Sequence, residues 1–277
     1  MFSSQTVPAL LFFAGLFFVP ESPRWLIKYK RTDEAETILN RVGGKAYAMA
    51  EAGNIRKSFS SEIKEDVWDI FNKDVRPIVL IGVLVAFFSQ ADGQNSLFSY
   101  APVIFKQAGM AEDAAFLQSV IIGVINFIFT FIAIVFIDKT GRKKLLLFGS
   151  FLLCIDALAL AWCFYTRAPG SYTLIFVFCF IAIYAATLGP VTWVILSEIF
   201  PNRIRGSSMA LATLVLWIAN FITTASFPIL KSYFGLHVTF AIHAGICLLY
   251  FIFIRYRIPE TKGKSLEEIE LALTSRV

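Results

Sequence analysis

The segment from Phe116 to Ile137 has the sequence FLQSVIIGVINFIFTFIAIVFI and contains no charged residue. A helix needs about 20 mainly apolar residues to cross a hydrocarbon core of about 30 Å. The segment is therefore long enough to span a bilayer. The charged stretch 138–144 (DKTGRKK) follows it directly, as is typical of a loop between two membrane helices. Together they predict a membrane protein.

Further apolar runs predict the rest of the fold. They lie near 76–104, 145–166, 172–199, 207–229 and 237–254. With 116–137 they indicate an all-α membrane protein whose domain 76–257 is a bundle of six full transmembrane helices. Residues 1–19 contain a shorter run, which is interpreted as a truncated transmembrane helix. The composition agrees, because 16% charged residues fall well short of the roughly 25% found in soluble domains.

Residues 20–75 differ in composition, being charged and polar with helical patterning. Thr32, followed by Glu34 and Glu36, resembles a capped helix start, and Gly43-Gly44 predicts the end of that helix. A second helix is expected over 47–65. This part is therefore predicted to be a helical domain outside the membrane, and 258–277 a polar tail.

The distribution of basic residues predicts the orientation. Of 25 Lys and Arg residues, only Lys106, Arg167 and Lys231 lie on one side of the alternating spans. The other side holds the segments 21–76, 138–144, 200–206 and 255–277. Loops rich in Lys and Arg stay in the cytoplasm. A multi-pass protein of the inner or plasma membrane with a cytoplasmic C-terminus is expected.

Other functional classes find no support in the sequence. The basic residues do not alternate with aromatic ones as in nucleic-acid-binding proteins, so no nucleic acid partner is expected. The four cysteines, all inside apolar runs, fit packing roles and lack metal-ligand spacing; they are Cys154, Cys163, Cys179 and Cys247. No Ser/His/Asp set or phosphate-binding loop occurs. We therefore expect neither an enzyme nor a cofactor or metal.

Four short motifs border the apolar runs. They are 20–26 (PESPRWL), 138–143 (DKTGRK), 189–193 (GPVTW) leading into 197–206 (SEIFPNRIRG), and 259–263 (PETKG). In this order and spacing they closely resemble the sugar porter branch of the major facilitator superfamily. The resemblance implies the C-terminal half of such a transporter, helices six to twelve, with the N-terminal half as its missing partner. Because Met1-Phe2 is similar to part of that family's sixth helix, the chain is expected to begin inside it.

The run from Phe88 to Pro102 is unusually polar for a membrane helix. Gly93 and Pro102 weaken the helix, and polar residues within a span are candidates for function. The polar side chains are Ser89, Gln90, Asp92, Gln94 and Asn95. Amides offer both donors and acceptors, which suits sugar hydroxyls. A polar seam between helices is the alternative interpretation.

The resemblance assigns a substrate site. It implies sugar contacts from Gln90 and Asn95, from Asn126, and from Trp193 beneath the sugar ring, while Gly189 leaves room on the same helix as Trp193. Trp217 and Asn220 match polar and aromatic positions on the eleventh helix. An aromatic face suits the apolar C–H groups of a pyranose. For the two tryptophans, helix packing is the alternative.

Some positions depart from the family pattern. Ser89 replaces a glutamine, Gln94 an aliphatic residue and Ser99 a tyrosine, while Leu216 stands where relatives have a polar residue. Asp92 is an additional carboxylate that is able to bind a hydroxyl, titrate during transport or cap the broken helix. These changes leave the identity of the sugar or polyol open.

The resemblance also implies a cytoplasmic charge network that locks one conformation. Its members are Glu21, Arg24, Asp138, Arg142, Glu198 and Arg205. Asp156 and His243 have no counterpart in the family pattern. The proton-linked carboxylate of bacterial relatives lies on helix one, so proton symport and facilitated diffusion both stay open.

The sequence therefore predicts half of a sugar transporter that works by alternating access, with sugar or polyol, the bilayer and, for symport, protons as partners. We expect the isolated chain to be unstable or inactive. The alternative is a nontransporting membrane sensor or interaction protein, or an inactive fragment, that keeps the transporter fold.

Overall fold

The computed structural model describes residues 6–60, 67–109, 112–201 and 204–263. The chain divides into two compact units, Met1–Glu65 and Asp66–Val277, which are described separately. Every regular element in the described ranges is a helix. The predicted start at Met1-Phe2, the end of the 47–65 helix and most of the 258–277 tail lie outside the described residues.

The described part of the first unit, residues 6–60, contains the helices α1 (Thr6–Leu16), α2 (Pro23–Lys28) and α3 (Thr32–Ser60). All residues of α1 are apolar or small, and none is buried. Pro23 opens α2, where its fixed φ and missing N–H are tolerated. The predicted interruption of α3 is present, because Gly44 has a φ of 81°. Buried apolar residues join α2 to both arms of α3; they are Leu26, Ile27, Ala35, Leu39, Ala48, Ala52 and Ile55.

Arg31 and Glu34 form an exposed ion pair at the start of α3, with 2.6 Å between Nη2 and Oε2. Hydrogen bonding to Arg31 lowers the pKa of the Glu34 carboxyl. Because both side chains are exposed, this pair contributes little to stability.

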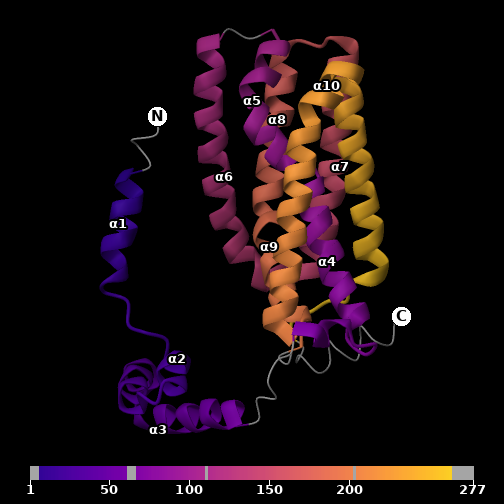
Figure 1. Ribbon diagram of the computed structural model, residues 1–277. Helices are drawn as coiled ribbons and strands as arrows, with labels where there is room; N and C mark the ends of the chain where they lie inside the picture. The colour runs from indigo at the N-terminus through magenta and orange to yellow at the C-terminus, as the bar shows by residue number, and fades with distance from the viewer. Residues whose placement is uncertain (1–5, 61–66, 110–111, 202–203, 264–277) are drawn as a thin grey trace. The chain divides into compact units, whose positions relative to one another are not determined.

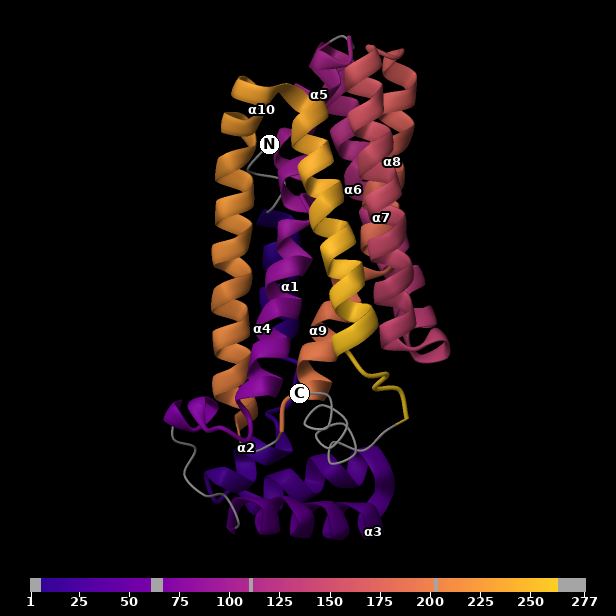
Figure 2. The same cartoon turned by 90° about the vertical axis from the view of Figure 1, so that its right-hand side faces the viewer.

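The second unit is a bundle of helices that run nearly along one axis (Figures 1 and 2). A short 3₁₀ turn, η2 (Val67–Phe71), precedes it. The helices are α4 (Arg76–Ala91), α5 (Gln94–Gln107), α6 (Glu112–Thr140), α7 (Arg142–Thr166), α8 (Gly170–Ala186), α9 (Leu188–Ile199) and α10 (Arg205–Arg257).

Five helical stretches in the described part are long and apolar enough to cross a membrane: Arg76–Gln107, Val120–Thr140, Arg142–Thr166, Gly170–Ile199 and Arg205–Arg257. The last of these, α10, turns back at Gly235, which has φ 79° and ψ 167°. Its two arms run antiparallel, one drawn in orange and one in yellow (Figures 1 and 2). Five of the six predicted apolar runs lie within one stretch or one arm, and the run 116–137 lies within α6 but begins before its apolar stretch.

The bundle also contains a break that the sequence analysis missed. The run 172–199 was treated as one helix, but it divides into α8 and α9 at Thr187, which has φ −130° and ψ −83°. Pro190 explains the break, because proline lacks the N–H that would bond to the carbonyl four residues earlier. The Thr187 hydroxyl donates instead to the Ile183 carbonyl.

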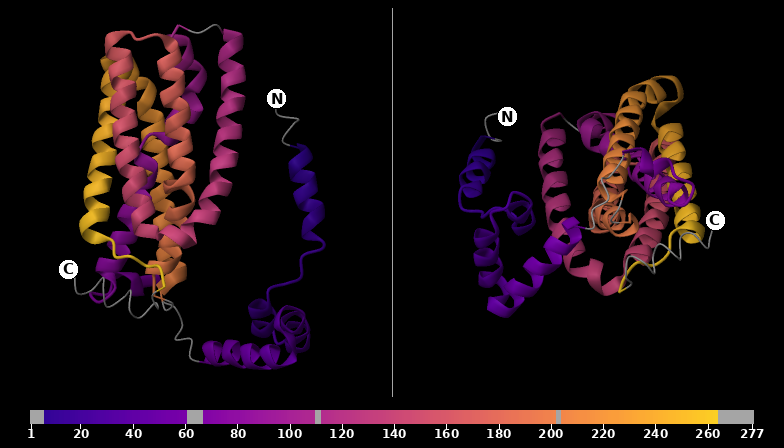
Figure 3. Two further views of the ribbon diagram at one scale, coloured as in Figure 1. Left: turned by 180° about the vertical axis from the view of Figure 1, so that it is seen from behind. Right: turned by 60° about the horizontal axis from the view of Figure 1, so that its bottom comes forward.

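The core of the second unit lies between α4, α7, α8 and the two arms of α10. Phe88 of α4 stacks on Tyr250 of the second arm, with 5.3 Å between ring centroids. Phe164 of α7 stacks on Phe240 of the same arm at 5.8 Å. Figure 3 shows this arm beside α7 in a view from behind and in a view in which the bottom of the bundle comes forward. These contacts pack α4 and α7 against the second arm of α10.

By contrast, α6 turns most of its apolar surface outward. In the apolar part of α6, only 17% of an 18-residue segment is buried, whereas 67% of the corresponding segment of the α4–α5 stretch is buried. Such an apolar surface is unsuited to water and suits lipid or another apolar protein surface.

Candidate functional site

The break between α4 and α5 organises the first candidate site. Gly93 has a φ of 96°, which a residue with a side chain rarely adopts. A Cβ atom there would also meet the His243 ring, 2.7 Å from its nearest atoms. The Asp92 Oδ1 atom accepts a hydrogen bond of 3.0 Å from the Gln94 N–H. Of the three roles considered for Asp92, capping of the broken helix is therefore present in the structure.

Three of the predicted substrate residues come together next to this break. The Gln90 Oε1 atom accepts hydrogen bonds from the side-chain amides of Asn95 and Asn220, the latter at 3.1 Å. The Thr224 hydroxyl donates to the side-chain oxygen Oδ1 of Asn220 at 3.3 Å. These residues come from α4, α5 and the first arm of α10. We call Gln90, Asn95 and Asn220 the amide cluster.

A second contact holds α5 to α10 beside the cluster. The Ser96 hydroxyl donates to the Thr223 carbonyl at 3.2 Å, and Ser96 is completely buried. Ser89, also a predicted substrate residue, donates instead to the Ala86 carbonyl of its own helix at 2.9 Å. Its hydroxyl is therefore bonded within α4 rather than to the cluster. Gln94 is buried at the first position of α5.

The other predicted substrate residues lie outside the hydrogen bonds of the amide cluster. Asn126 of α6 is half-buried, and its carbonyl accepts from the Thr130 hydroxyl. Trp193 and Trp217 have exposed fractions of 44% and 61% in this structure. Their rings are therefore available for contacts beyond the core of the unit. At Gly189 a Cβ would approach the Tyr184 ring to 3.2 Å, so this glycine makes room for Tyr184.

Sequence reasoning did not single out Tyr184 and Thr224. The Tyr184 hydroxyl lies 3.4 Å from the Ser89 carbonyl oxygen, next to the amide cluster. Threonine and tyrosine are frequent in apolar helices, so neither stood out in the pattern. His243 was recognised as ionisable without a role; its Nδ1 atom lies 3.4 Å from the Ala91 carbonyl oxygen at the break.

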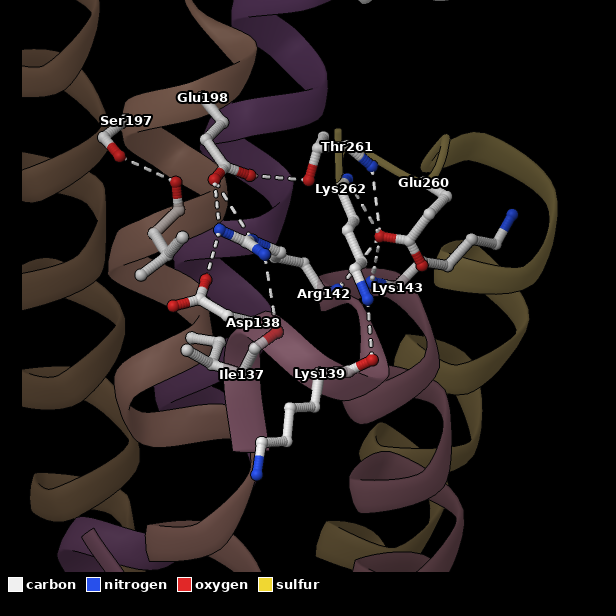
Figure 4. A network of polar contacts seen from close by, with 11 residues as sticks. Ile137, Asp138, Lys139, Arg142, Lys143, Ser197, Glu198, Glu260, Thr261 and Lys262 are labelled. Atoms are coloured by element: carbon white, nitrogen blue, oxygen red, sulfur yellow. Dashed lines mark hydrogen bonds and ion pairs between the residues drawn. The ribbon is translucent and has the colours of Figure 1, made fainter. Parts of the chain in front are cut away.

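A cluster of charges lies at one end of the bundle (Figure 4). Arg142 at the start of α7 pairs with Asp138 and with Glu198 of α9, both at 3.0 Å. The second Glu198 oxygen accepts the Thr261 hydroxyl at 2.6 Å. The predicted partners Asp138, Arg142 and Glu198 are thus in contact. We call this end of the bundle the charged end.

Glu260 completes the charged end and was not among the predicted site residues. Its Oε1 atom accepts the backbone N–H groups of Arg142 at 3.0 Å, Thr261 at 3.1 Å and Lys262 at 3.2 Å. It therefore caps the N-terminus of α7, where unpaired N–H groups favour a negative charge. A Cβ at Gly141 would meet the Glu260 carboxylate. The motif 259–263 was the available signal, but its acidic residue had no assigned partner.

The remaining members of the predicted charge network are placed differently. Arg205 donates from Nε to the Phe200 carbonyl at 3.2 Å. It braces the turn before α10, and in the described structure it forms no ion pair with Glu198. Glu21 and Arg24 are exposed residues of the first unit, so their link to the network stays a prediction.

Residues 1–273 match the family model described as Sugar (and other) transporter. The chain belongs to this family. The arabinose-proton symporter of Bacillus subtilis (strain 168) is 41% identical over 271 residues, which are 98% of this chain and 58% of that protein. The D-xylose-proton symporter of Escherichia coli (strain K12) is 39% identical over 277 residues, 98% of this chain and 56% of that protein.

Solved structures agree. The proton:xylose symporter XylE bound to 6-bromo-6-deoxy-D-glucose matches with a TM-score of 0.82 and 38% identity, covering 98% of this chain and 58% of that one. The chain thus spans less than two thirds of the length of these relatives. As a member of the sugar transporter family it is an all-α, multi-pass membrane protein with the major facilitator fold, and the family consists of transporters rather than enzymes.

Proposed function

We propose that this chain forms one wall of the substrate path in a sugar transporter that works by alternating access. The observation that carries the proposal is the amide cluster, where Gln90, Asn95 and Asn220 meet beside a helix break. Interrupted helices near the middle of the bilayer are where transporters of this kind bind substrate. The relatives named as arabinose-proton and D-xylose-proton symporters support a sugar as the substrate.

The chemistry of the cluster suits a polyhydroxylated ligand. A carboxamide presents an N–H donor and a C=O acceptor in one plane, and a sugar hydroxyl needs both. Asn95 and Asn220 are half-buried, so their amides can exchange the bond with Gln90 for bonds to a ligand. The exposed rings of Trp193 and Trp217 provide apolar faces for the C–H side of a sugar ring.

The helix break and the charged end would both take part in the conformational change. The glycine break is the point about which α5 would pivot against α4, and the hydrogen bonds from Ser96 to Thr223 and from Asn95 to Gln90 would change with that motion. The ion pairs of Arg142 at the charged end bias the equilibrium between two conformations, since they form in only one of them. The excess of Lys and Arg in the loops at this end supports a cytoplasmic location for it and for the C-terminus.

The test is uptake of labelled arabinose, xylose, glucose and myo-inositol by cells that lack their own carriers and express the protein from its complete gene. Loss of one charge-neutral hydrogen-bond donor costs about 1 kcal/mol, so we expect Gln90→Ala and Asn220→Ala each to reduce uptake about fivefold or more. Asn54→Ala removes an exposed amide of α3 and should leave uptake unchanged. Uptake of none of these sugars, or equal uptake by all variants, would contradict the proposal; binding without uptake would favour the sensor alternative.

A further inference from the structure

Asp92 has a second property that the role of a helix cap does not explain. Its side chain is only 1% exposed. Oδ1 accepts the Gln94 N–H, but Oδ2 is buried without a hydrogen-bond partner in the described structure. A helix cap needs only one acceptor oxygen. A serine, threonine or asparagine would therefore serve as well, and the second carboxyl oxygen needs another explanation.

Among the described residues, no cation pairs with this carboxyl. The titratable side chains that interact electrostatically with Asp92 include Tyr184 of α8 and Cys247 and Tyr250 of α10. His243 of α10 packs on the neighbouring Gly93. The described cations on the elements around α4 and α5 stand at or near helix ends: Arg76 starts α4, Lys106 ends α5, Lys139 ends α6, Arg142, Lys143 and Lys144 start α7, Arg205 starts α10, and Lys231, Arg255 and Arg257 lie near the ends of its two arms. The described carboxyls there are Asp69 of η2, Asp138 of α6, Asp156 of α7 and Glu198 of α9, and the remaining titratable groups are Tyr100 of α5, Cys154, Cys163 and Tyr165 of α7, Tyr172 and Cys179 of α8, and Tyr233, His237 and Tyr256 of α10. Within the described residues Asp92 forms no ion pair.

The imidazole of His243 is uncharged as well. A carbonyl oxygen can only accept, so the Nδ1 atom facing the Ala91 carbonyl carries the proton. The other ring nitrogen, Nε2, is buried without a partner. A proton on Nε2 would add a buried, unpaired charge, which is unfavourable. His243 thus offers Asp92 no positive charge in this conformation.

An ionised carboxylate that is buried without a counter-charge takes up a proton instead. We propose that Asp92 is a proton-binding site: it is a neutral carboxylic acid in this conformation and releases its proton to water when α5 moves about Gly93. The O–H bond at Oδ2 breaks, the carboxylate keeps the electron pair, and a water molecule admitted at the opened break takes the proton. The coupling of this step to sugar rests on the proposed function; the proton site itself does not.

The position of Asp92 explains how binding of the proton and binding of the sugar would be linked. It lies between Gln90 and Asn95, which hydrogen-bond to each other across the break. A sugar that draws these amides apart must change the geometry of Gly93, and with it the hydrogen bond from Gln94 to Asp92. The proton site and the amide cluster therefore share one hinge.

Infrared spectroscopy on the purified full-length protein in lipid nanodiscs tests the proton site without any transport. A protonated carboxyl has a C=O band separate from those of carboxylates and amides. We expect this band to persist at neutral pH and to lose intensity in Asp92→Asn and in Asp92→Ser, both of which keep an acceptor for the Gln94 N–H. Asp156→Asn is measured beside them, because Asp156 of α7 is a second buried carboxyl with an unpartnered oxygen; its loss identifies the share of the band that does not come from Asp92. An unchanged band in both Asp92 variants would overturn the proposal.

Proton movement tests the coupling. In a weakly buffered suspension of proteoliposomes, sugar entry should be accompanied by proton entry, and the ratio of protons to sugar should fall at least twofold in Asp92→Asn but stay unchanged in Asp156→Asn. A wild-type ratio in Asp92→Asn would overturn the coupling. If no sugar enters with the unaltered protein, the proposed function fails, whereas the infrared result still decides the proton site.

Discussion

Gly93 shows how one residue determines the local structure of the candidate site. Its positive φ ends α4 and starts α5, and its missing side chain leaves room for the His243 ring. The sequence predicted the weak point, because glycine in an apolar run is a known helix breaker. It did not predict His243 as the neighbour, since the two residues are far apart in the chain and only packing brings them together.

Gly93→Ala should therefore be strongly destabilising. A left-handed conformation costs an L-residue on the order of 1–3 kcal/mol, and the methyl group would displace the His243 ring as well. Thermal unfolding in detergent should show a clear drop in Tm. Gly123→Ala is the matched control, because Gly123 lies within α6 with nothing within 4 Å of an added Cβ, and alanine favours the helix by about 1 kcal/mol. Equal Tm values for the two variants would show that Gly93 is not constrained as described.

The residues of the amide cluster could be predicted from the sequence because amides stand out in apolar runs. Gln90 and Asn95 were identified in this way and Asn220 by the family resemblance, although their mutual hydrogen bonds were not predicted. Thr224 and Tyr184 were missed because their types are common in membrane helices. The part of the site that could not be predicted is thus the part made by ordinary residues in particular positions.

At the scale of helices, hydropathy located the spans well but not their interruptions. The break at Thr187 was missed because 172–197 contains no charged residue, and hydropathy does not record the hydrogen bond that Pro190 cannot make. The cap of α7 was missed for a different reason. Glu260 follows α10 and is separated from Arg142 by 118 residues, so only the fold brings the carboxylate to the helix N-terminus.

Glu260→Gln tests this cap. Glutamine keeps an acceptor oxygen but removes the negative charge at the N-terminus of α7, an effect of about 0.3–1 kcal/mol, or up to about 2 kcal/mol for a partly buried group. We expect a lower Tm and faster hydrogen exchange of the amides of Arg142 and Lys143. In the control Glu34→Gln the exposed pair with Arg31 is lost, which should change stability very little. Exchange at Arg142 that is unaffected by Glu260→Gln would exclude the capping role.

At the scale of the whole molecule, the remaining prediction is the orientation of the second unit in the membrane. The charged end carries α6–α7 and α9–α10 loops rich in Lys and Arg, whereas the opposite end, where α7 passes to α8, carries Arg167. Basic loops stay in the cytoplasm during insertion because translocating them is unfavourable. The charged end and the C-terminus should therefore face the cytoplasm.

Cysteine labelling in intact cells tests this orientation. In a background without the four native cysteines, Ser171→Cys at the start of α8 and Thr140→Cys at the end of α6 place one exposed thiol at each end of the bundle. A maleimide that cannot cross the membrane should label the first from outside and the second only after the cells are permeabilised. Because the two thiols are matched in exposure and differ in their end of the bundle, each serves as the control for the other. The reverse pattern would place the charged end outside, and the ion pairs of Arg142 would then gate the outer rather than the cytoplasmic entrance.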